Sequence, residues 1–126
     1  MDDLIKKLNL ITVDKSYILH APLDYELPEV KTLVNSEEVD SEFNWVQAFY
    51  YYEEDLTREL PSLEEKMANS GMLWICWPKR SAKMATDLSD NVVRSIGLAC
   101  GLVDTKVASI DETWSALKFV YRLKDR

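Results

Sequence analysis

Short apolar runs alternate with amphipathic stretches along the chain, and this pattern predicts strands that alternate with helices. The runs rich in β-branched and aromatic residues, which strands favour, cover residues 16–22, 30–34, 45–52, 72–78, 105–110 and 113–123. Stripes of apolar side chains at helical spacing predict helices near residues 2–8, 56–67 and 92–100. The order of these elements predicts an α/β fold in a single domain over residues 1–126.

The second predicted helix contains a proline. Its apolar stripe consists of Leu56, Leu60, Leu63 and Met67. Pro61 lies inside this stripe, and because proline lacks a backbone N–H and clashes with the preceding turn, we expect a kink or a restart near Leu60. The sequence Asn-Ser-Gly at 69–71 predicts the end of the helix.

The run MLWICWP at 72–78 is apolar at consecutive positions, which is typical of a strand buried on both faces. We therefore predict a central strand, in which the largely buried residues are Leu73, Ile75, Cys76 and Trp77.

The last third of the chain predicts a helix and a hairpin. The side chains expected to face the sheet from this helix are Val92, Ile96 and Ala99. Gly101 is expected to end the helix at Cys100 in a left-handed conformation. The last two apolar runs flank a short turn at Asp111 and Glu112, which predicts an antiparallel pair.

The net charge of −7 is unevenly distributed. Residues 1–70 carry a net charge of −10 and residues 71–126 a net charge of +3. Nucleic acid is an unexpected partner because the far field of an acidic protein repels phosphate, whereas a local basic patch can still hold a small anion.

The composition indicates neither a membrane segment nor a metal site. No apolar run approaches the ~20 residues that span a bilayer, and the first ten residues do not resemble a signal peptide, so we expect a cytoplasmic location. Cys76 and Cys100 lack metal-ligand spacing and further cysteines, so neither a metal site nor a disulfide is predicted.

The element order of the second half is similar to the carboxyl-terminal portion of Rossmann-like methyltransferases. This resemblance implies a three-layer sandwich with a mainly parallel sheet, a strand order of about 2-1-3-4-6-5 and a C-terminal antiparallel hairpin.

Residues 73–122 also resemble a bacterial family of short proteins of unknown function. The motifs that carry the resemblance are WPK(K/R) at 77–80, ATDL at 85–88, GLVDxKV at 101–107 and WSxLKFV at 114–120. The resemblance supports the fold and implies no established activity.

The basic sequence PKRSAK follows the predicted central strand. Ligands of open α/β sheets bind outside the carboxyl ends of the strands, and the side chains delivered there are Lys79, Arg80, Ser81 and Lys83. We expect them to hold a phosphate or carboxylate; the alternative is that they are solvated or pair with the many carboxylates of the chain. His20 and Trp114 are expected at the same edge, with Trp114 either stacking on a ligand or packing against Trp77 or the helix after the central strand.

Two classes of function remain open. Methyltransferases place a glycine-rich loop after the first strand, whereas here HAPLDYELP follows it and no glycine precedes Gly71. This favours a non-catalytic binding or regulatory domain on a degenerate methyltransferase-like scaffold, with no cofactor and with a small anion or a protein as its partner. The alternative is a small enzyme acting on an anionic metabolite, with Lys79 and Arg80 binding the substrate and His20 as the acid–base group. A pocket joining His20 to the two cations would favour the enzyme, and an exposed apolar patch without such a pocket would favour a protein partner.

Overall fold

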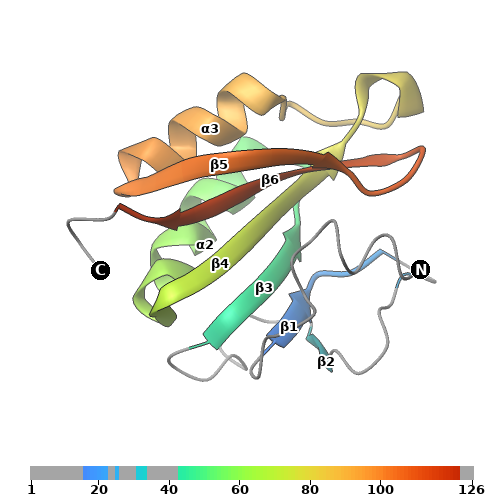
Figure 1. Cartoon of the computed structure of the whole chain (residues 1–126). Helices are drawn as coiled ribbons and strands as arrows, with labels where there is room; N and C mark the ends of the chain where they lie inside the picture. Colours follow the sequence, from blue (N-terminus) through green and yellow to red (C-terminus); the bar gives the residue numbers. More distant parts are fainter. Residues whose placement is uncertain (1–15, 23–24, 26–30, 34–42, 123–126) are drawn as a thin grey trace.

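The computed structural model describes residues 16–22, 25, 31–33 and 43–122, which form a six-stranded sheet and two α-helices (Figure 1). In chain order the elements are β1 (Ser16–Leu19), β2 (Lys31–Leu33), β3 (Phe43–Phe49), α2 (Glu53–Glu65), β4 (Met67–Pro78), the short 3-10 helix η2 (Arg80–Ala82), α3 (Asp90–Ala99), β5 (Leu102–Ser109) and β6 (Trp114–Tyr121). Each predicted strand has a counterpart here, and its ends differ from the predicted ones by at most five residues. The helix predicted at 2–8 lies outside the described residues.

The sheet is mixed. Its strand order is β2-β1-β3-β4-β6-β5, which matches the predicted order. The β1–β2, β1–β3 and β3–β4 pairs are parallel, whereas β6 is antiparallel to both β4 and β5. The predicted C-terminal hairpin is thereby confirmed, and the parallel part of the sheet ends at β4.

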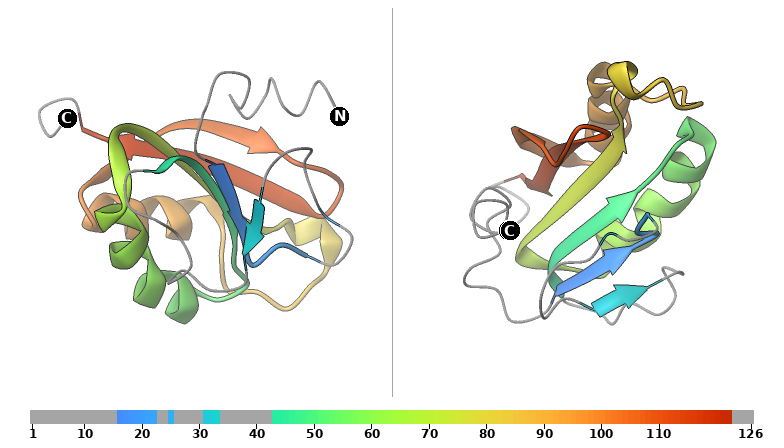
Figure 2. Two further views of the ribbon diagram at one scale, coloured as in Figure 1. Left: turned by 90° about the horizontal axis from the view of Figure 1, so that it is seen from below. Right: turned by 90° about the vertical axis from the view of Figure 1, so that its right-hand side faces the viewer.

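Both described helices lie on one face of the sheet (Figure 2). Alternate β4 side chains point to opposite faces, so Leu73, Ile75 and Trp77 pack with the helices, whereas Trp74 and Cys76 belong to a second core on the other face. All five are 5% exposed or less, which confirms the predicted central strand. No described helix contributes to the second core, so the described residues form two layers instead of the predicted three. Among these residues no helix is long and apolar enough to cross a bilayer.

The segment 69–71 belongs to β4 and does not end a helix, contrary to the prediction. α2 runs through Pro61 without a restart and ends at Glu65, and β4 begins two residues later. The pairing of β3 with β4 shifts register between Phe43 and Trp45. A Cβ atom on Gly71 would lie 2.8 Å from the Phe43 carbonyl oxygen. Glycine is therefore required there because the β3 backbone approaches closely.

α3 faces the sheet with a different set of side chains from the predicted one. Val93, Ile96 and Gly97 are the buried residues of this helix, whereas Ala99 is exposed. A Cβ atom on Gly97 would lie 2.1 Å from the Phe119 ring, so only glycine allows α3 to approach β6 this closely. The predicted end of the helix is confirmed, since Cys100 caps it and Gly101 follows with a φ of +90°.

Candidate functional site

The loop between β4 and α3, residues 79–89, begins with a lysine held by the β5–β6 turn. Pro78 ends β4, and the Lys79 backbone N–H donates to the Thr113 carbonyl oxygen at 2.7 Å. The Lys79 ammonium donates to Ser109 Oγ and to the Asp111 carbonyl oxygen, both at 2.5 Å. Lys79 lies at the predicted sheet edge, but these two bonds direct its charge toward the protein's own turn.

The turn that receives Lys79 is itself ordered by a carboxylate. Asp111 Oδ1 accepts hydrogen bonds from the backbone N–H groups of Thr113 and Trp114, both at 2.8 Å. Such an Asx-type arrangement satisfies backbone donors that a tight turn leaves unpaired. The lysine therefore bonds to a preformed acceptor.

The far end of the 79–89 loop is fixed to the start of α2. Asp87 Oδ1 accepts a hydrogen bond from the Glu53 backbone N–H at 2.6 Å, and Thr86 Oγ1 donates to the Tyr51 carbonyl oxygen at 2.5 Å. A carboxylate at a helix N-terminus is favourable because the first N–H groups lack partners and carry partial positive charge. Tyr52, the residue at the N-cap position, makes no side-chain bond of this kind, so Asp87 provides the cap from another part of the chain.

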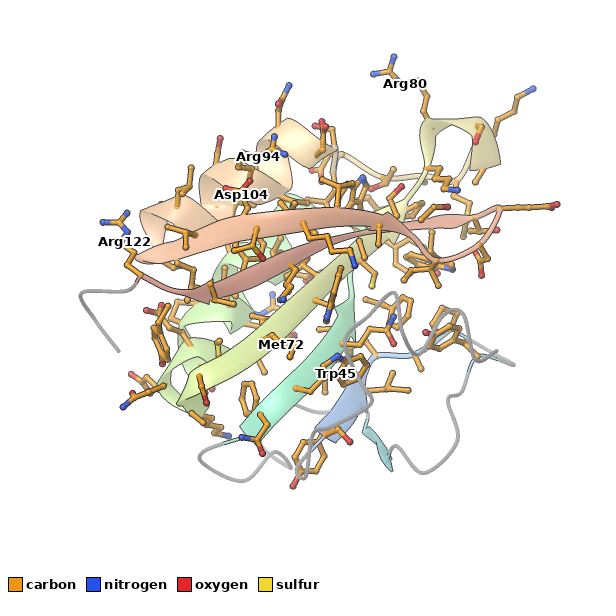
Figure 3. The ribbon with its side chains drawn as sticks, in the orientation of Figure 1. Trp45, Met72, Arg80, Arg94, Asp104 and Arg122 are labelled. Carbon is orange, nitrogen blue, oxygen red and sulfur yellow. The ribbon has the colours of Figure 1, made fainter. Side chains whose placement is uncertain are left out.

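A pocket of about 680 Å³ opens between this loop, the start of α3 and the hairpin. The side chains that surround it are those of Trp77, Pro78, Lys79, Arg80, Ser81, Met84, Thr86, Asp87, Leu88, Ser89, Asp90, Val107 and Ser115. Two cations and two carboxylates are therefore present beside four hydroxyl groups and an apolar wall. Arg80 is exposed and points away from the sheet (Figure 3).

His20 lies in a separate pocket of about 300 Å³, at the ends of β1 and β3. Its Nε2 atom is 2.8 Å from Glu59 Oε1, which also accepts a hydrogen bond from the Tyr50 hydroxyl at 2.9 Å. The Tyr50 ring is 3% exposed, and burial, together with the nearby Glu59 carboxylate, raises the pKa of Tyr50 well above its usual range. His20 has a φ of 58°, a left-handed conformation that is uncommon outside glycine.

The predicted site residues are thus only partly brought together. Lys79, Arg80 and Ser81 line the pocket at the end of β4, whereas Lys83 does not line it. Trp114 is 4% exposed and packs edge-on against Phe49 and Tyr51 at centroid distances of 5.0 and 5.4 Å. Trp114 is therefore packed, but its partners differ from the expected ones, since Trp77 and the buried residues of α3 belong to the core on the other face of the sheet.

Sequence reasoning missed the residues that shape this pocket from the α3 side. Thr86 and Asp87 occur in the quoted ATDL motif without an assigned role, and Ser89 caps α3 by accepting from the Val92 N–H at 3.3 Å. The Thr-Asp-x-Ser sequence before an amphipathic stretch was the available signal, since such residues cap helices. In the described part of the chain, no group of His, Cys, Asp and Glu side chains could hold a metal ion.

Comparison with known proteins supports the fold alone. No protein-family model matches the chain, and no curated protein matches it. Several of the solved structures that match are named as methyltransferases. Magnesium protoporphyrin IX methyltransferase from Synechocystis, with bound S-adenosylhomocysteine, is 10% identical with a TM-score of 0.56 over 74% of this chain and 52% of its own. The chain thus spans about half the length of that protein.

Two further matches have higher TM-scores. A TehB-like S-adenosylmethionine-dependent methyltransferase from Corynebacterium glutamicum is 9% identical with a TM-score of 0.60, over 95% of this chain and 86% of its own. PigF with S-adenosylhomocysteine is 9% identical with a TM-score of 0.61, over 86% of this chain and 56% of its own. The fold is methyltransferase-like, and at these identities the likeness extends to the fold only.

Proposed function

We propose that the chain is a non-catalytic binding domain on a methyltransferase-like fold, with a small polar ligand in the pocket at the end of β4. The observation that carries this proposal is the separation of the histidine from the cations. His20 lines one pocket with Glu59 and Tyr50, whereas Lys79 and Arg80 line another. A catalytic arrangement needs the acid–base group within hydrogen-bond reach of the bound substrate.

The residues after β1 do not fit the methyl donor of the related enzymes. A close-approach loop needs glycine, because a Cβ atom would keep the backbone away from the ligand. Here His20 takes the left-handed conformation that glycine usually supplies, and its ring is bonded to Glu59 and lies edge-on to Tyr50 at 5.5 Å. Side chains therefore occupy the position beside β1 where a bare backbone would be required.

The chemistry of the β4 pocket favours a ligand with an anionic group. Arg80 offers a planar fork of donors suited to phosphate or carboxylate, and Ser81 and Ser89 add hydroxyl groups. Lys79 has donated two bonds to the hairpin, so it contributes mainly its positive charge. Asp87 and Asp90 also line the pocket, and their negative charge disfavours a bare anion and favours a ligand that also carries donors.

One observation favours an alternative function, a small enzyme acting on an anionic metabolite. The short His20–Glu59 contact is the arrangement in which a carboxylate orients an imidazole for proton transfer. In that case the reaction would occur in the pocket at the end of β1. The β4 pocket would then bind a different part of the substrate, or would not contact the substrate.

Calorimetry with two ligand classes separates these possibilities. We expect no low-micromolar binding of S-adenosylmethionine, and binding of nucleoside phosphates or phosphorylated sugars that also raises the unfolding temperature. Arg80→Ala should abolish that binding with the fold retained, whereas Lys83→Ala, which removes a cation from the same loop outside the pocket, should not.

Two results would contradict the proposal. Tight binding of S-adenosylmethionine that is lost in a His20→Ala variant would mean that the end of β1 is a cofactor site. An equal loss of phosphate binding in the Arg80→Ala and Lys83→Ala variants would mean that the loop attracts anions only by its overall charge.

A further inference from the structure

A groove of about 480 Å³ is lined by residues at the start of α2 and along α3. The groove is lined by Glu53, Thr57, Asn91, Val92, Ser95, Ile96, Ala99 and Cys100. None of these residues lines the pocket at the end of β4. The groove is therefore a second surface feature, separate from the proposed ligand site.

The floor of the groove is apolar. Val92, Ile96 and Ala99 recur at four and three residues along α3, which places them on one stripe of the helix. This is the stripe that the sequence predicts to face the sheet. The helix is rotated so that Val93 and Gly97 face the sheet, and Val92 and Ala99 are left partly or fully accessible beside α2.

Carboxylates stand near both ends of the groove. Glu53 is the one charged residue among those that line the groove. It is the first residue of α2, and Asn91 also lines the groove. At the other end, Glu64 lies just outside the lining, and its Oε1 atom is 3.7 Å from the place of a Cβ atom on Gly101, the residue after Cys100. Glu53 and Glu64 are about 16 Å apart along the helix at 1.5 Å per residue. Residues of α2 include six acids and a single base, Arg58, which is paired with Asp55 at 2.9 Å.

We infer that this groove docks a basic amphipathic segment of another protein, with apolar side chains against the accessible parts of Val92 and Ala99 and cations near Glu53 and Glu64. Apolar burial supplies the attraction, and the two carboxylates select for lysine or arginine and against acidic segments. A helix would place its cations about eleven residues apart to match the spacing of about 16 Å.

The chain carries a natural reporter for this surface. Cys100 lines the groove, whereas Cys76 is fully buried in the core. A disulfide reagent such as dithionitrobenzoate should therefore modify a single thiol in the folded protein, by attack of the Cys100 thiolate and release of thionitrobenzoate. The rate of this reaction reports directly on occupancy of the groove.

The test uses three synthetic peptides of about 14 residues, which span roughly 21 Å as a helix. The first has leucines on one helical face and lysines elsewhere; the second has the same composition without an apolar face; the third has glutamate in place of lysine. We expect the first peptide alone to slow modification of Cys100, by about tenfold near saturation.

Two matched variants locate the effect. Ala99→Arg places a cation and a long side chain in the groove and should weaken binding of the first peptide at least about tenfold. Leu98→Arg adds the same side chain at the neighbouring exposed position, which does not line the groove, and should leave binding unchanged.

Three outcomes would overturn the inference. Equal protection by the peptide without an apolar face would mean that charge alone is responsible. Equal weakening by both arginine variants would place the peptide elsewhere. If the protein without peptide sediments as a dimer and Cys100 becomes reactive only on dilution, then the groove is occupied by a second copy of the chain.

Discussion

The ends of β1 and β4 lie on the same edge of the parallel part of the sheet, but the residues there make different kinds of hydrogen bonds. At the end of β1, bonds between side chains join His20, Glu59 and Tyr50 around a small pocket. At the end of β4, Lys79 bonds to a hydroxyl and a backbone carbonyl of the hairpin, and a larger pocket remains open beside it.

Under the proposed function, the two ends of the sheet edge have different roles. The β1 end is the place where the related folds need close backbone approach, and here polar side chains bond to each other instead. At the β4 end, hydrogen bonds hold both ends of the 79–89 loop, and residues of this loop line the larger pocket.

The largest expected effect is at the floor of the β4 pocket. Trp77 is 5% exposed and packs in the core shared with the helices. Trp77→Ala should lower the free energy of unfolding by about 3–5 kcal/mol, through lost burial and an unfilled cavity. Urea unfolding measures this. An unchanged midpoint would mean that the pocket floor is not part of the core.

The next largest effect is a dependence of stability on pH, and it comes from Tyr50 at the end of β1. The folded protein raises the pKa of Tyr50 above the ordinary value of 10.0, because the ring is buried and Glu59 is close. The folded state therefore binds the phenol proton more tightly than the unfolded state does. Stability from this group is complete below about pH 10 and is lost as the pH rises further, by up to about 1.4 kcal/mol per pH unit.

Urea unfolding at about pH 9 and about pH 11 checks this dependence in the native chain and in Tyr50→Phe. The variant should lose less stability between the two conditions. Tyr25 also has a raised pKa through burial, so a smaller dependence should persist in the variant. If Tyr50→Phe keeps the full dependence, then the β1 end does not contribute to it.

The smallest of these effects concerns the link between the two ends. Asp87 lines the β4 pocket and caps the N-terminus of α2. The same helix contains Glu59, which bonds to His20. Asp87→Ala should lower the free energy of unfolding by about 1 kcal/mol and speed hydrogen exchange at the start of α2. Glu112→Ala, at an exposed position in the hairpin turn, is the control and should change neither. Equal effects of both variants would mean that Asp87 is not a specific cap.

Much of the fold could be predicted because its signals are local. Consecutive apolar residues from Leu73 to Trp77 mark the central strand, and Gly101 marks the end of α3. The failures involve glycines whose role depends on distant residues. Gly71 makes room for the carbonyl of Phe43, and Gly97 makes room for the ring of a residue on β6. A helical stripe counted from apolar side chains does not detect either requirement.

The candidate site could be predicted less well for a similar reason. The sequence places Lys79 at the correct edge of the sheet, but one of its acceptors is the backbone carbonyl of Asp111, which has no sequence signature. His20 is kept apart from the cations because β3 lies between β1 and β4. A shared edge therefore does not imply a shared pocket.

The position of β6 between β4 and β5 has a consequence for folding during synthesis. Among the described strands, β5 pairs only with β6. One edge of β4 also pairs with β6, so this edge has no partner until β6 has been synthesised. At a translation rate of about 5–20 residues per second, the roughly 40 residues from the end of β4 to the end of β6 take about 2–8 s to add. Until then the nascent chain presents an unpaired, apolar strand edge, which is a site for aggregation or for binding by a chaperone.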